Sequence, residues 1–118
     1  KYANRFWSPH VKQRIAEQLK YIDHWKIIEQ DYSLASNSEA TWFIDPPYAK
    51  YGHGYRIGSK NLDYKVLATW CKNRRVQVIV CENVGATWLP FRHWRDIQSN
   101  AAKGNKTKIS KEAIWLNE

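Results

Sequence analysis

The sequence predicts an α/β fold, in which helices cover a parallel sheet, and three observations lead to this prediction. Two segments, 8–23 and 64–73, carry apolar residues at helical spacing. Short, mainly apolar runs of the kind found in buried strands lie between and after them. Helices that alternate with such strands are typical of a parallel sheet covered on both faces. The runs that predict strands are 25–32, 41–44, 76–83 and 112–117.

The first predicted helix has a clear start. Ser8 can cap it, and Pro9 suits the first helical position because proline lacks an N–H that the helix would leave unpaired there. The strand that follows, 25–32, would end near Asp31. The apolar face of the helix would comprise Val11, Ile15, Leu19 and Ile22.

Two prolines mark the end of the second predicted strand. The run TWFI at 41–44 stops at Asp45 because Pro46 and Pro47 cannot feed a central strand ladder. Residues 48–61, rich in Gly, Tyr, Lys and Arg, then predict a long surface loop.

The second half of the chain begins with a capped helix. Asp63 can cap the helix over 64–73, and 76–83 gives the strongest strand signal in the chain. Beyond that strand, 84–94 predicts a loop or turn, and 101–111 predicts a flexible, lysine-rich stretch. The inward face of the helix would hold Val66, Leu67 and Trp70.

Composition and charge favour a nucleic-acid partner. The 118 residues suit one domain or part of one, and 43% hydrophobic with 25% charged residues is typical of a globular chain. A formal net charge of +8 and a sequence pI near 9.6 suit a polyanion. Seven Trp and seven Tyr supply flat surfaces that can pack in a core or stack on bases. Trp42, Trp70 and Trp88 are expected in the core, whereas Lys103, Lys106, Lys108 and Lys111 form either a solvated face or a phosphate contact.

The sequence gives no sign of a metal centre or a membrane span. Its four histidines show no metal spacing, so no metal is expected. Cys71 and Cys81 form no metal spacing and no disulfide framework, which favours reduced thiols in a cytoplasmic protein. No apolar run approaches the roughly 20 residues that a spanning helix needs.

Three acids fall at or near the ends of predicted strands. Asp31, Asp45 and Glu82 would therefore lie on one rim of a parallel sheet, where ligands of α/β proteins bind. The alternative is that each is a polar residue that merely ends a strand.

The segment DPPY, Asp45 to Tyr48, can hold an aromatic amine. The Asp45 carboxylate and the Pro46 carbonyl are two acceptors, and Pro47 fixes the direction of the second. Two acceptors that grip one NH2 group favour a pyramidal nitrogen, whose lone pair can then attack an electrophilic methyl group. Tyr48 can stack on the ring that carries the amine, once a duplex has released that base.

These residues and their surroundings resemble a known family. DPPY is the catalytic motif of the S-adenosylmethionine-dependent DNA adenine N6-methyltransferases. The blocks EQDY, ATWFIDPPY, DYKVLATWCKNR, QVIVCENVGATWLPF and SKEAIW look like successive blocks of restriction–modification or phage-type members. The resemblance implies a partial Rossmann-like methyltransferase sheet with flanking helices and a DNA substrate. It also implies catalytic roles for Asp45, Pro46, Pro47 and Tyr48, contacts of Asp31 and Tyr32 with the cofactor, and contacts of Tyr51, His53, Tyr55, Arg56 and Lys60 with DNA.

The chain also departs from this family. The glycine-rich cofactor loop after the first strand, and the acid that holds the cofactor ribose, are absent from residues 1–118. We therefore expect a partial catalytic domain, the carboxy-terminal portion of a longer enzyme, with an exposed sheet edge that can self-associate. The alternatives are an RNA base methyltransferase, an inactive nucleic-acid-binding remnant, and a DPPY turn without a catalytic role.

Overall fold

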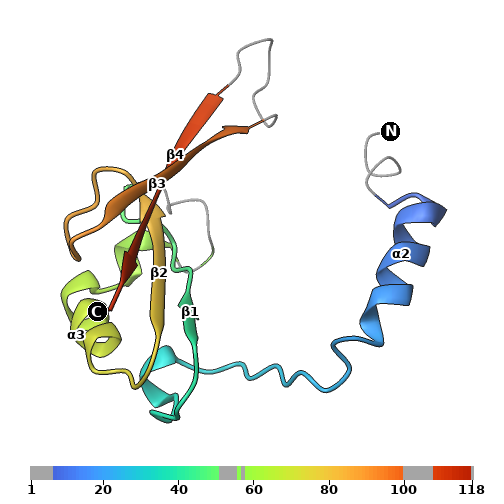
Figure 1. The fold of residues 1–118 in the computed structure, drawn as a ribbon, viewed down its shortest axis with the longest axis horizontal. Coiled ribbons are helices and arrows are strands. Elements are labelled where there is room, and N and C mark those ends of the chain that lie inside the picture. The colour runs from blue at the N-terminus through green and yellow to red at the C-terminus, as the bar shows by residue number, and fades with distance from the viewer. Residues whose placement is uncertain (1–6, 51–55, 57, 100–107, 118) are drawn as a thin grey trace. The chain divides into compact units, whose positions relative to one another are not determined.

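A computed structural model describes residues 7–50, 56, 58–99 and 108–117 of the chain (Figure 1). The chain divides into two compact units, Lys1–Leu34 and Ala35–Glu118, and each is described by itself. The first unit contains helix α2 (Pro9–Leu19) and the 3-10 helix η1 (Tyr32–Leu34). None of the helices among the described residues is long and apolar enough to cross a bilayer.

Helix α2 begins where the sequence predicts. Ser8 is its N-cap, and the Ser8 side chain accepts a hydrogen bond from the Val11 N–H at 3.3 Å, with Pro9 at the first position. The helix ends at Leu19, four residues earlier than expected, and residues 20–24 form turns. Its predicted apolar face is not buried, because Ile15 and Leu19 are exposed.

The predicted strand over 25–32 is wrong. Residues 25–29 form no strand in the described part of the chain, Ile27 is 99% exposed, and Tyr32 already belongs to η1. An apolar run becomes a strand only where a neighbouring strand pairs its N–H and C=O groups. Asp31 therefore precedes a 3-10 turn and does not end a strand.

The second unit contains a mixed four-stranded sheet in the order β1-β2-β4-β3. Its strands are β1 (Trp42–Ile44), β2 (Val78–Asn83), β3 (Arg92–Ser99) and β4 (Lys108–Leu116). Only β1 and β2 are parallel, while β4 is antiparallel to both β2 and β3. The sheet and helices agree with the coarse α/β prediction, but a wholly parallel sheet is wrong. The connection from β1 to β2 contains helix α3 (Tyr64–Lys72), as a parallel pair requires, whereas a shorter connection lets β3 and β4 pair antiparallel.

Two sequence boundaries also need correction. β3 begins at Arg92, so the loop predicted over 84–94 ends earlier. β4 begins at Lys108, so residues 108–111 of the stretch predicted to be flexible are strand, while 101–107 lie outside the described residues. Polar strands of this kind escape a search for apolar runs.

Helix α3 packs on one face of the sheet and forms the core there. Asp63 caps the helix, accepting hydrogen bonds from the Lys65 and Val66 N–H groups at 2.9 and 3.1 Å. Trp70 lies edge-on to Trp42, with ring centroids 5.6 Å apart, whereas Val66 is 54% exposed and does not face inward as predicted. The buried apolar residues are Leu67, Ala68, Cys71, Val78, Val80, Leu89 and Ala113.

Val76, in the turn before β2, has an unfavourable backbone conformation. Its φ is +64°, in the left-handed region that β-branched residues rarely adopt. Asn117 holds this turn, since its side chain donates to the Val76 carbonyl and accepts from the Val78 N–H, both at 2.6 Å. The Val76 side chain is 62% exposed, so little packing compensates for the strain.

We therefore predict that Val76→Asn stabilises the protein by about 1 kcal/mol, because asparagine tolerates a positive φ better than valine. Urea denaturation should show a higher midpoint with an unchanged slope. Val66→Asn, at an exposed helical position, is the matched control and should give no gain. An unchanged or lower midpoint for Val76→Asn would contradict the strain assigned to this turn.

Candidate functional site

The DPPY segment lies beside the carboxyl end of β2. β1 ends at Ile44, which is paired in parallel with Val80, and Asp45 follows at once. The carboxyl ends of β1 and β2 thus meet at the edge of the sheet where ligands of α/β proteins bind. The sequence placed Glu82 at this edge, and it is the second-last residue of β2.

A buried carboxylate holds the DPPY loop in place. Glu82 is 1% exposed, and its Oε2 accepts hydrogen bonds from the Ala49 N–H at 2.9 Å and the Trp88 indole N–H at 3.0 Å. Its Oε1 accepts from the Asn83 N–H at 2.9 Å. These charge-assisted bonds offset the cost of burying the charge. The same acid therefore anchors the loop after β1 and the loop after β2.

Helix α3 provides a second anchor for the loop. The Tyr64 hydroxyl, in the first turn of the helix, donates to the Pro47 carbonyl. The Tyr64 ring packs against Trp88, with centroids 5.4 Å apart, and Trp88 packs edge-on against Phe91 at 5.0 Å. Burial, and then the charge of Glu82, raise the pKa of Tyr64, which keeps its hydroxyl a donor. The backbone on the carboxyl side of Pro46 is therefore fixed from two directions.

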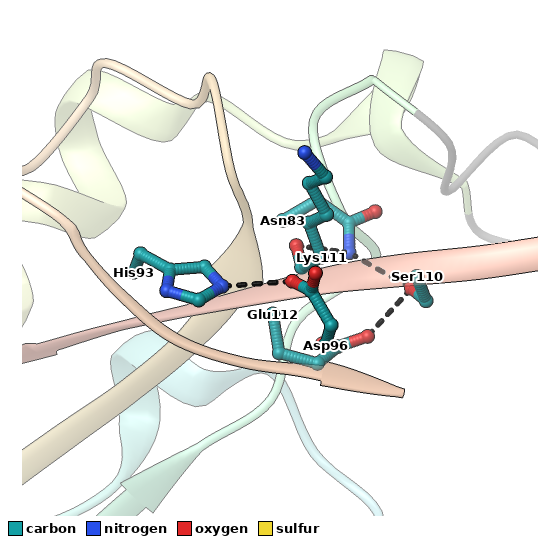
Figure 2. A network of polar contacts seen from close by, with 6 residues as sticks. All are labelled: Asn83, His93, Asp96, Ser110, Lys111 and Glu112. Atoms are coloured by element: carbon teal, nitrogen blue, oxygen red, sulfur yellow. Dashed lines mark hydrogen bonds and ion pairs between the residues drawn. The ribbon is translucent and has the colours of Figure 1, made fainter. Parts of the chain in front are cut away.

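Tyr48 is tied to the neighbouring strand β4. Its hydroxyl donates to Glu112 Oε2 at 3.0 Å, and the Ser110 hydroxyl donates to Glu112 Oε1 at 2.6 Å (Figure 2 shows the Ser110–Glu112 part). The Asn83 amide lies 3.4 Å from the Ser110 hydroxyl. Burial, followed by the hydrogen bond to Glu112, raises the pKa of Tyr48 far above its usual value. Tyr48 is thus a half-buried ring whose hydroxyl remains a donor.

The two acceptors proposed to grip an amine remain available. Among the described residues, neither the Asp45 carboxylate nor the Pro46 carbonyl accepts a hydrogen bond, although the Pro47 carbonyl beside them does. Asp45 is exposed, and Pro46 is half-buried. Burial, and then the charges of Asp45 and Glu112, raise the pKa of Cys81, which indicates that both carboxylates lie near this residue of β2.

The two residues expected to contact the cofactor lie in the first unit. Asp31 is exposed, and its Oδ1 accepts hydrogen bonds from both the N–H and the hydroxyl of Ser33. These bonds lower the pKa of Asp31 and begin the turn that contains Tyr32. Asp31 therefore has a structural role in its own unit, and its contact with a cofactor stays a prediction.

The predicted DNA-contacting loop is only partly described. Tyr51, His53 and Tyr55 lie outside the described residues, whereas Arg56 and Lys60 are exposed. Lys60 belongs to a short 3-10 helix, η3 (Ser59–Asn61). Among the residues that the structure describes, no group of three His, Cys, Asp or Glu side chains could hold a metal ion.

Sequence reasoning missed two residues that hold this site. Glu112 and Tyr64 are distant from DPPY in the sequence, and no local signal indicates that their side chains contact it. Glu82 was found as an acid near a strand end, but its contact with Ala49 required the parallel pairing of β1 and β2.

No protein-family model, curated protein or solved structure matches the chain.

We predict that Glu82→Gln lowers the free energy of unfolding by about 1–3 kcal/mol. The amide NH2 would face an N–H donor, so at least one buried donor would lose its acceptor. Chemical denaturation followed by tryptophan fluorescence measures the effect. Glu39→Gln, which changes an exposed acid before β1, should leave stability unchanged. Equal stability of the Glu82 variant and the wild type would show that the carboxylate does not anchor the loops.

We also predict an energetic coupling of about 1 kcal/mol between Tyr48 and Glu112. Tyr48→Phe, Glu112→Ala and the double variant form a thermodynamic cycle measured by urea denaturation. The control cycle pairs Tyr64→Phe with Glu112→Ala, and it should be additive because the Tyr64 hydroxyl bonds to Pro47. Additive effects in the Tyr48 cycle as well would rule out the tether.

Proposed function

We propose that this chain is the catalytic part of an S-adenosylmethionine-dependent methyltransferase that acts on the exocyclic N6 amine of adenine in DNA. The observation that carries this proposal is the contrast within the DPPY loop. Its Pro47 carbonyl and Ala49 N–H are held by Tyr64 and Glu82, while the Asp45 and Pro46 acceptors are unbonded within the described chain.

The chemistry of the free acceptors suits an aromatic amine. The Asp45 carboxylate and the Pro46 carbonyl each accept one N–H of the NH2 group, which favours a pyramidal nitrogen. A loop fixed in advance need not reorganise when the amine becomes tetrahedral, so its contacts favour the transition state. Tyr48 offers a ring, held by Glu112, on which the base stacks outside its duplex.

S-adenosylmethionine supplies the electrophilic methyl group when it is bound. Asp31 fits an amine donor such as that of the cofactor's adenine, because it is exposed and Ser33 occupies only its Oδ1 within the described residues. Tyr32, next in the chain, would flank the same ring.

A DNA substrate is favoured by the basic chain and by the motif blocks that surround DPPY. The net charge of +8 suits any nucleic acid, and an RNA base would use the same grip on its amine. The order of the blocks resembles DNA enzymes, so DNA is the substrate proposed. The assay below therefore includes RNA as a separate substrate.

We predict that Asp45→Ala lowers the rate of methyl transfer about 10²–10³-fold, because it removes one of two preorganised acceptors. The assay measures transfer of labelled methyl from S-adenosylmethionine to adenine-containing duplex DNA, with protein expressed from its complete reading frame. The stability of this variant should stay within about 0.5 kcal/mol of wild type, since Asp45 is exposed.

Glu39→Ala, which removes another exposed acid, should retain the wild-type rate. Near-normal turnover by Asp45→Ala would exclude the role given to this acid. Methylation of RNA without methylation of DNA would contradict the proposed DNA substrate and favour an RNA substrate. No transfer to either, by a protein that binds the cofactor, would refute the proposed function.

A further inference from the structure

The strands β3 and β4 form a two-stranded ribbon that extends beyond the rest of the sheet (Figure 1). β2 pairs with residues 112–116 of β4, so the outer part of the ribbon, Asp96–Ser99 with Lys108–Lys111, pairs only with itself among the described strands. The described side chains of β3, from Arg92 to Gln98, are all exposed. A ribbon with so little packing is marginally stable on its own, so its length is not explained by the core.

A register shift decides which side chains share a face of this ribbon. Arg92 pairs with Ile114, and Arg95 pairs with Glu112, because an irregularity between His93 and Arg95 adds one residue to β3. Residues three apart in a regular strand point to opposite faces, and an inserted residue restores them to the same face. Both arginines therefore lie on the face that carries Glu112.

Both arginines keep guanidinium donors available, although Arg95 lies across the ladder from Glu112. Of the described residues, neither Arg92 nor Arg95 forms an ion pair, while the one acid of β3, Asp96, lies 2.8 Å from His93 Nε2 (Figure 2). The Arg95 guanidinium lies 4.0 Å from the centroid of the half-exposed Trp94 ring. An arginine supported in this way keeps its planar fork of N–H donors available for an anion such as phosphate.

This face is continuous with the candidate site. Glu112, opposite Arg95, accepts a hydrogen bond from the hydroxyl of Tyr48. The Tyr48 ring is the one proposed to hold the target base. Arg92 and Arg95 face positions two residues apart on β4, about 7 Å along the strand. That separation equals two base steps of about 3.4 Å measured along the axis of a duplex. The sequence from Arg92 to Leu116 contains six Lys or Arg and two Asp or Glu, so its charge complements a polyanion.

We infer that the Arg92 and Arg95 face of the β3–β4 ribbon binds the phosphate backbone of duplex DNA beside the base that Asp45 and Tyr48 receive. The inference rests on the proposed function for the identity of that base. The contact itself requires only the ribbon and a duplex. The arginines contact phosphates and carry no sequence preference, so they hold the duplex in position next to the site.

Binding of a short fluorescein-labelled DNA duplex to the 118-residue chain, measured by anisotropy at several salt concentrations, tests this interface. The double variant Arg92→Gln/Arg95→Gln should bind more weakly. It should also reduce the slope of log K against log salt by about 1.8, because two phosphate contacts are lost. The charge-conserving variant Arg92→Lys/Arg95→Lys should keep most of the slope. Circular dichroism spectra confirm that each variant is folded.

The matched control is Lys65→Gln/Lys72→Gln, which removes two exposed charges from helix α3. A wild-type slope in the arginine variant, or an equal loss in the lysine control, would overturn the inference. A loss seen with RNA while duplex DNA binding stays unchanged would overturn it as well. A reduced salt slope in the arginine variant, together with no methylation of DNA by the wild-type protein, would support the interface and refute the proposed chemistry. Methylation of DNA by the wild-type protein, together with a wild-type salt slope in the arginine variant, would support the proposed chemistry and refute the interface.

Discussion

The buried carboxylate of Glu82 is the constraint on which the second unit depends. An unpaired charge at 1% exposure would cost several kcal/mol, so this side chain must be surrounded by donors. The donors come from two loops, through the Ala49 backbone and the Trp88 indole. Neither loop can move away without leaving a buried acceptor or donor unpaired. The solvation of one acid therefore fixes the backbone that follows Asp45, and this fixed backbone is what a preorganised site requires.

The proposed chemistry of the DPPY loop depends on which of its acceptors receive hydrogen bonds and which do not. A loop that only reverses the chain would satisfy its carbonyls wherever donors are near. Here Tyr64 satisfies Pro47 and Glu82 holds Ala49, but the acceptors of Asp45 and Pro46 are unbonded among the described residues. Rigid surroundings with free acceptors suit binding of a donor, because the ordering cost is met during folding and not during binding. The catalytic role proposed for the loop depends on this division.

The sequence predicted those elements whose signals are local. The caps Ser8 and Asp63 begin their helices as expected, and the prolines after Asp45 end β1. The prediction of a strand at 25–32 was wrong because strand formation depends on a neighbouring strand to pair with, and no local pattern reveals that neighbour. β3 was missed for the opposite reason, since its polar sequence shows no apolar alternation, yet β4 pairs with it along its length. The contacts of Tyr48 with Glu112 and of Tyr64 with Pro47 depend on how strands and helix pack. Patterns among residues adjacent in the sequence therefore cannot predict these contacts.

The single extra residue in β3 links the ribbon to the candidate site. In a regular ladder continuing from Arg92 and Ile114, Trp94 would face Glu112 and Arg95 would face Lys111, which puts two positive charges together. The observed shift instead sets Arg95 opposite Glu112 and Asp96 opposite Lys111, so opposite charges face each other twice. It also brings the two arginines to the face where Glu112 holds Tyr48. A single change in register thus favours the pairing of the ribbon electrostatically. It also aligns a basic surface with the ring proposed to hold the substrate.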